Sequence, residues 1–182
     1  MGGVVAHAGT WRATTRETGD HKGPPIHLSS ALAPTEREGV IMIGIVLAAH
    51  GPLSGAFLES TRMILGDLPQ VASISLMPGD SLEGLADRLQ AAVNEVNTGD
   101  GVLILLDMFG GTPANATAFL TQQANDVHAV TGMNLPMLLE TFMERMNTDR
   151  LESLAETAFS AGHTGIVDIV AAFKKFQQDK AG

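Results

Sequence analysis

The sequence contains no cysteine and no tyrosine, and only one tryptophan and seven phenylalanines among its 182 residues. Without cysteine the chain has no disulfide, no thiol nucleophile and no thiolate metal ligand. The scarcity of aromatic rings argues against a surface on which nucleic-acid bases stack. Basic residues are also few: 11 Lys and Arg against 20 Asp and Glu give a net charge of −9. Such a chain is repelled by a phosphate backbone, so we predict no nucleic-acid partner.

Long hydrophobic runs are missing as well. No stretch reaches the roughly 18 uncharged apolar residues that span a bilayer. Hydrophobic residues nevertheless make up 45% of the chain, which is enough for the core of one domain. We therefore expect a soluble, cytoplasmic protein.

The chain divides near residue 40 into two parts of different composition. Residues 1–40 are rich in Gly, Thr, Ser, His and Pro, show no apolar periodicity, and hold four basic and four acidic residues. Such a composition cannot bury enough surface to offset chain entropy. We predict a flexible N-terminal extension over 1–40 and a folded domain over 41–182. Met42 offers a second start just where the domain begins, so part of the extension could be an upstream-start artefact.

Apolar runs and helical stripes alternate after residue 40. The runs, typical of strands, cover 41–49, 71–76, 101–107 and 126–132. Helical stripes occupy 53–68, 82–96, 135–146 and 151–158, and Asp80 with Glu83 resembles a capping box before the second of these. This alternation predicts an α/β fold, an open doubly wound, mainly parallel sheet of about four strands with helices on both faces.

A histidine and an aspartate end two of the predicted strands. His50 closes the first strand and Asp107 the third. In the common 2-1-3-4 strand order these strands are neighbours, and ligands bind beyond their carboxyl ends. A carboxylate that accepts the Nδ1 proton fixes the imidazole tautomer and leaves Nε2 as a nucleophile. Taken singly, each residue is also compatible with a structural role, as a core histidine or as a strand-end or helix-capping aspartate.

The stretch "FGGTPAN" (109–115) is a strand-to-helix turn. Gly110 and Gly111 permit close approach of a ligand to the backbone, Thr112 suits an N-cap and Pro113 the first helical position. Free N–H groups at such a helix start bind anions, although helix starts of this kind are also often purely structural. Together with a histidine nucleophile the turn points to phosphoryl transfer through phosphohistidine. No P-loop lysine and no carboxylate cluster for Mg²⁺ is present, so we expect no cofactor and no metal.

Four motifs, "MIGIVLAAHG", "MPGD", "LLDMFGGTPANA" and "TGMNLPMLLET", together resemble the IIA component of the mannose-type (mannose/fructose/sorbose) sugar phosphotransferase system. The resemblance runs in collinear order over roughly residues 42–170. It implies that His50 accepts a phosphoryl group, that Asp107 supports the histidine, and that Gly110, Gly111 and Thr112 hold the phosphate.

The resemblance also implies partners. The donor is the histidine-containing phosphocarrier protein, the acceptor a IIB component, expected in trans, and the sugar enters through a membrane IIC/IID complex. Family members are commonly homodimers with an exchanged C-terminal strand; "HTGIVDIV" (163–170) is the candidate for this strand, which we expect to be antiparallel. Which sugar is carried is not encoded here, since the IIA component never contacts it.

One alternative function fits the sequence equally well, and two others fit less well. A regulatory protein that is phosphorylated on His50 and signals sugar or nitrogen status needs the same histidine, so the sequence leaves this alternative open. A receiver-like domain needs acidic residues where His50 stands. A hydrolase of the α/β class needs a serine at a strand-to-helix elbow, and none is found.

Overall fold

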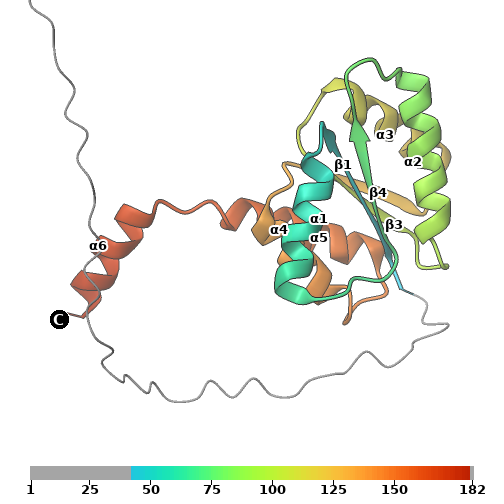
Figure 1. Cartoon of the computed structure of the whole chain (residues 1–182). Helices are drawn as coiled ribbons and strands as arrows, with labels where there is room; N and C mark the ends of the chain where they lie inside the picture. Colours follow the sequence, from blue (N-terminus) through green and yellow to red (C-terminus); the bar gives the residue numbers. More distant parts are fainter. Residues whose placement is uncertain (1–41, 181–182) are drawn as a thin grey trace, which may run out of the picture. The chain divides into compact units, whose positions relative to one another are not determined.

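The computed structural model describes residues 42–180, so the expected extension over 1–40 lies outside the described residues. Strands and helices alternate as predicted (Figure 1). The strands are β1 (Gly44–His50), β2 (Val71–Leu76), β3 (Val102–Leu106) and β4 (Val127–Thr131). The helices are α1 (Leu53–Leu65), α2 (Leu82–Val96), α3 (Gly111–Gln123), α4 (Leu135–Glu144), α5 (Leu151–Thr164) and α6 (Ile169–Asp179).

All four strands form one parallel sheet in the order β2-β1-β3-β4. The predicted fold class and strand order are therefore confirmed. The central strands β1 and β3 read as continuous apolar runs because helices cover both faces of the sheet. Within residues 42–180 no helix combines the length and apolarity that a bilayer span requires.

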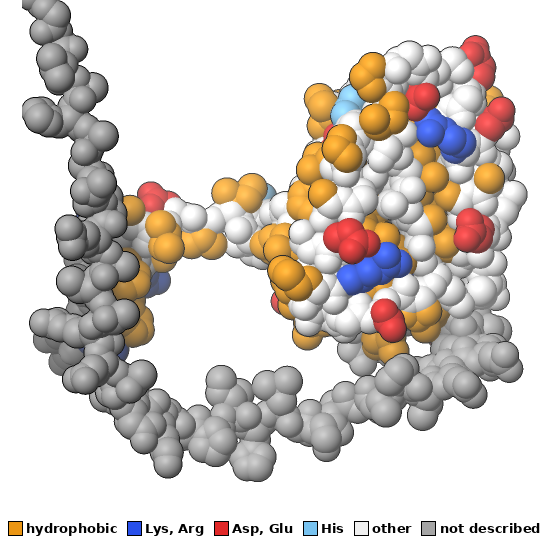
Figure 2. All heavy atoms as spheres, in the orientation of Figure 1, with side chains coloured by type: hydrophobic (Ala, Val, Ile, Leu, Met, Phe, Trp, Pro, Cys, Tyr) orange, Lys and Arg blue, Asp and Glu red, His pale blue; other side chains and the backbone are white. Residues whose placement is uncertain are grey.

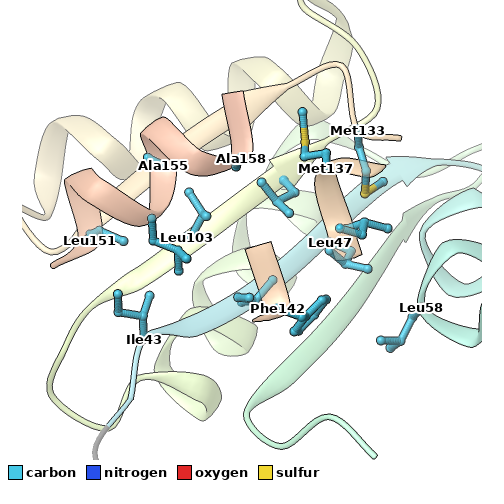
Figure 3. Packing of buried hydrophobic residues seen from close by; sticks show 14 of the residues in the cluster. Ile43, Leu47, Leu58, Leu103, Met133, Met137, Phe142, Leu151, Ala155 and Ala158 are labelled. Atoms are coloured by element: carbon cyan, nitrogen blue, oxygen red, sulfur yellow. The ribbon is translucent and has the colours of Figure 1, made fainter. Parts of the chain in front are cut away.

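Each face of the sheet has its own hydrophobic core. Alternate residues of β1 and β3, such as Leu47 and Leu103, point toward α4 and α5, where Figure 3 shows them among side chains that include Phe142 and Ala158. The intervening residues pack under α2 and α3. Burial of one such leucine contributes about 1.5–3 kcal/mol, so the two cores hold the carboxyl ends of β1 and β3 in fixed register.

Gly44 shows how tightly β1 is packed at its start. A Cβ atom at this position would lie 2.6 Å from the carbonyl oxygen of Val96 at the end of α2. Only glycine lets the strand and the helix approach this closely. The apolar run thus needs a glycine for packing, not for flexibility.

Two local predictions were wrong. Ser81, not Asp80, caps α2: its hydroxyl accepts the Gly84 N–H at 3.0 Å. Thr112 is not the N-cap of α3, because the helix begins one residue earlier, at Gly111, with Gly110 as the capping position. Both glycines have positive φ, a backbone conformation that the side-chain pattern does not reveal.

The segment 163–170 is not a strand in the single chain. Helix α5 continues to Thr164, and α6 starts at Ile169 after Asp168, whose carboxylate accepts the N–H groups of Val170 and Ala171. A strand needs a neighbouring strand for its hydrogen bonds, whereas a helix forms its own. Exchange of this segment between two chains therefore stays a prediction.

Candidate functional site

The fold brings His50 and Asp107 together at the carboxyl edge of the sheet. Ala48 of β1 pairs with Leu106 of β3, so the residues that end these neighbouring strands meet. The Nδ1 atom of His50 lies 3.0 Å from Oδ2 of Asp107. The predicted strand order therefore brings the histidine and the aspartate into contact, as expected.

Asp107 is held by two backbone groups in addition to the imidazole. The His50 N–H donates to Oδ2 at 2.9 Å, and the Met108 N–H donates to Oδ1 at 2.9 Å. Both carboxylate oxygens are therefore fixed before any ligand binds. The side chain of Asp107 is 12% exposed, whereas that of His50 is 43% exposed. A partner can therefore reach the imidazole of His50 but not the carboxylate of Asp107.

These contacts determine the ionisation of the carboxyl group. Burial by itself raises the pKa of Asp107, but the bonds from the backbone and side chain of His50, the charge on His50 and the Met108 N–H act in the opposite direction. The net result is a pKa for Asp107 below its ordinary value. Asp107 is consequently a carboxylate at neutral pH, able to accept the Nδ1 proton and to stabilise a positively charged ring.

The glycine turn lies beside the other nitrogen of the imidazole. A Cβ atom on Gly111 would stand 3.4 Å from both Nε2 and Cε1 of His50. The φ angles of Gly110 and Gly111 are +83° and +76°, a region that L side chains disfavour. Glycine at position 111 therefore keeps the space next to Nε2 open.

Helix α3 supplies the electrostatics for an anion in that space. The first N–H groups of a helix have no partner within it, and its N-terminal end carries partial positive charge. Here these groups belong to Gly110, Gly111 and Thr112, since Pro113 has no N–H. The arrangement suits three oxygens of a phosphoryl group better than a cation.

The turn after β2 borders the same edge, although its motif "MPGD" predicted no site residue. Leu76 pairs with His50, and its carbonyl accepts the Gly51 N–H at 2.8 Å. Asp80 then holds the turn: its Oδ2 accepts the Met77 N–H at 2.8 Å and a bond from Arg88 at 2.6 Å. The proline-glycine pair in "MPGD" predicts a turn. It does not predict the hydrogen bonds of the backbone N–H groups there, because every residue except proline carries such a group.

Comparison with known proteins places the fold in a class, the IIA components of sugar phosphotransferase systems. A solved EIIA structure from Streptococcus agalactiae superposes with a TM-score of 0.67 at 30% identity, covering 71% of this chain and 99% of that one. A mannose/sorbose-specific IIA subunit from Enterococcus faecalis gives a TM-score of 0.65 at 28% identity, covering 70% of this chain and 95% of that one.

Within this class the chain belongs to the EIIA-man family, described as the PTS system fructose IIA component, whose model matches residues 44–159. A sorbose-specific EIIA component from Lacticaseibacillus casei is 37% identical over 103 residues, which cover 57% of this chain and 74% of that protein. The mannose-specific EIIAB component of Escherichia coli is 32% identical over 124 residues, 68% of this chain but only 38% of that longer protein. The resemblance found in the four motifs is thereby confirmed.

Proposed function

We propose that the chain is a phosphocarrier that receives a phosphoryl group on His50 from the histidine-containing phosphocarrier protein and passes it to a IIB component. The observation that supports the proposal is that the two nitrogens of the His50 imidazole face different groups. Nδ1 lies 3.0 Å from Asp107, and Nε2 faces the glycine turn at the start of α3. Family membership supports the same reaction.

In the proposed step the lone pair of His50 Nε2 attacks the phosphorus atom. A P–N bond forms on His50 as the P–N bond of the donor histidine breaks, and the donor ring keeps that electron pair. The Nδ1 proton stays on His50, hydrogen-bonded to Asp107, which offsets the positive charge of the phosphorylated ring. The N–H groups of Gly110, Gly111 and Thr112 bind the phosphoryl oxygens throughout.

The onward route follows from the same chemistry. The IIB component takes the phosphoryl group by the reverse displacement and delivers it to sugar that enters through the membrane IIC/IID complex. Donor and acceptor of this relay are cytoplasmic, so the proposal locates the chain in the cytoplasm. No cofactor or metal enters the step.

We further propose that the active form is a homodimer. The outer edge of β4 lies in an open groove of about 730 Å³ between α3 and α5, lined by small side chains such as Ala114 and Ala118. The apolar residues Ile166, Val167 and Ile169 are 79%, 65% and 74% exposed. Their β-branched side chains suit a strand added to that edge by a second chain. Sedimentation equilibrium should give a dimer that Ile166→Asp dissociates, and a wild-type monomer would contradict the exchange.

The relay itself is tested by intact-mass measurement after mixing the protein with phosphoenolpyruvate, enzyme I and the phosphocarrier protein. We expect one acid-labile phosphoryl group on the wild type and none on His50→Ala, with circular dichroism confirming that the variant folds. Failure to label the wild type with a competent donor would refute the proposal. Loss of the label on addition of IIB would support transport, and a label that IIB cannot remove would favour a regulatory role.

A further inference from the structure

Helix α6 carries an apolar strip that stays exposed within residues 42–180. Ile169, Phe173 and Phe176 recur at the spacing of one helix face, and they are 74%, 62% and 54% exposed. The two phenylalanine rings contact each other, with their centroids 6.5 Å apart. No residue of α6 is buried. The strip is therefore an apolar surface that a partner of suitable chemistry can cover.

The lysines of residues 42–180 all lie in this helix or directly after it. At 3.6 residues per turn, Lys174 and Lys175 fall on opposite sides of the apolar strip. Lys180 follows the helix, and its Nζ atom lies 4.5 Å from the centroid of the Phe176 ring. Residues 169–180 thus hold three lysines against one acidic residue, and this charge borders the apolar strip.

The body of the domain, residues 42–164, has the opposite composition. It contains fourteen acidic residues and four arginines, but no lysine. Arg62 forms an ion pair with Glu59 at 3.3 Å, and Arg88 with Asp80 at 2.6 Å. Figure 2 shows acidic side chains spread over the visible face of the body with basic ones beside them, whereas hydrophobic side chains line α6. Positive charge is therefore concentrated where the phenylalanines are exposed.

The length and the side chains of α6 indicate a lipid surface as the partner. An isolated helix of eleven residues is marginal in water, so an apolar surface would stabilise it. Eleven residues are too few to span a bilayer, but a helix with aromatic rings on one face and lysines beside them can lie in its interface. The rings enter the headgroup boundary, while the lysine stems extend along it and bring their ammonium groups to anionic headgroups.

We infer that α6 is a membrane-surface anchor that binds anionic phospholipids, with both phenylalanine rings in the headgroup boundary and the three lysines against the lipid phosphates. The inference goes beyond the proposed function, because it concerns where the carrier works and not the transfer itself. Phe173 lies beyond 163–170, the segment of the proposed strand exchange, so one chain can do both.

The test is co-sedimentation of the full chain with vesicles. We expect binding to vesicles of phosphatidylcholine mixed with phosphatidylglycerol, release by high salt, and binding about tenfold weaker to phosphatidylcholine alone. Phe173→Ser combined with Phe176→Ser should weaken binding to the anionic vesicles about tenfold, and so should Lys174→Gln combined with Lys175→Gln. Phe119→Ser is the matched control: Phe119 is also an exposed phenylalanine (60%), but it lies on α3 in the body, and this variant should bind as wild type does.

Three results would overturn the inference. They are no binding of wild type to the anionic vesicles, equal binding to the neutral ones, and unchanged binding in the double phenylalanine variant. If that variant loses a dimer while it keeps its vesicle binding, a second chain and not lipid covers the strip. Labelling of His50 without vesicles reports on the proposed function separately and should be equal in wild type and the α6 variants. A wild type that binds anionic vesicles but is never labelled would support the anchor and refute the proposed function.

Discussion

Asp107 is the residue on which the proposed chemistry depends most after His50 itself. Its carboxylate is 12% exposed and receives three hydrogen bonds, two of them from His50. The sequence predicted the side-chain pair because both residues end apolar runs. The sequence did not predict the hydrogen bonds from the backbone N–H groups of His50 and Met108, because almost every residue type carries such a donor.

Asp107→Asn removes the negative charge while keeping the shape of the side chain. We expect the initial rate of phosphoryl transfer from the phosphocarrier protein to fall by about 100-fold or more, because the charged ring loses its counter-ion and its tautomer is no longer fixed. Intact-mass time courses measure the rate. Asp67→Asn, a change at an exposed position of the same domain, serves as control and should leave the rate unchanged. Equal rates in Asp107→Asn and wild type would show that the carboxylate is structural.

The lowered pKa of Asp107 also predicts a pH dependence of stability. A carboxyl group whose folded-state pKa lies below the unfolded value of about 3.9 stabilises the fold above that pH, and this contribution is lost as the pH falls through the folded pKa. Urea unfolding at pH 6 and at successively lower values below 4 should show a steeper loss in wild type than in Asp107→Asn. Asp80, whose pKa is also lowered, is retained in both proteins and cancels in the comparison. If the free energy of unfolding falls with pH equally in the two proteins, the pKa of Asp107 is not lowered by folding.

At the scale of elements, the pattern of apolar residues predicted every strand of the described region and the helices α1, α2, α4 and α5, whereas α3 was inferred from the glycine turn before it and α6 was not predicted. Periodicity works here because β1 and β3 are buried on both faces and these four helices are amphipathic, whereas α3 is not. The helix starts were less well predicted. Asp80 and Ser81 are both good caps, and only the turn geometry assigns Asp80 to Met77 and Arg88. Gly110, not Thr112, occupies the N-cap of α3. Helix-cap propensities favour threonine and do not predict the positive φ angles of Gly110 and Gly111.

The glycine turn gives a prediction that separates strain from helix propensity. Gly111→Ala places a methyl group 3.4 Å from the imidazole at a φ of +76°. We expect it to lower the free energy of unfolding by about 1–2 kcal/mol and to slow transfer, because the left-handed conformation is costly and the space beside Nε2 is filled. Gly55→Ala is the matched control: Gly55 lies in α1 with open space around its Cβ position, so the change should stabilise by about 0.5–1 kcal/mol. Urea denaturation and transfer rates decide, and identical effects at both positions would contradict the role given to the turn.

At the scale of the whole molecule, the C-terminal segment is where sequence and structure diverge. The β-branched residues of 163–170 suggest a strand, yet α6 follows α5 in the single chain. The physical reason is that strand pairing is a property of two segments, and the second segment need not belong to the same chain. Residues 166–180 are exposed throughout, and the proposed exchange between two chains would bury part of this segment.

The acidic surface of the domain should increase the rate at which it meets the phosphocarrier protein. With fourteen acidic and four basic residues in 42–164, the domain attracts a donor with a basic surface over distances near the Debye length, about 10 Å at 0.1 M salt. The second-order rate of labelling by the phosphocarrier protein should therefore fall by about tenfold between roughly 20 mM and 200 mM salt, as is typical of steered association. Labelling by phosphoramidate should not fall with salt, because this small anion is not attracted to the acidic surface. A protein-donor rate that stays flat with salt would show that the acidic surface does not steer the donor to this domain.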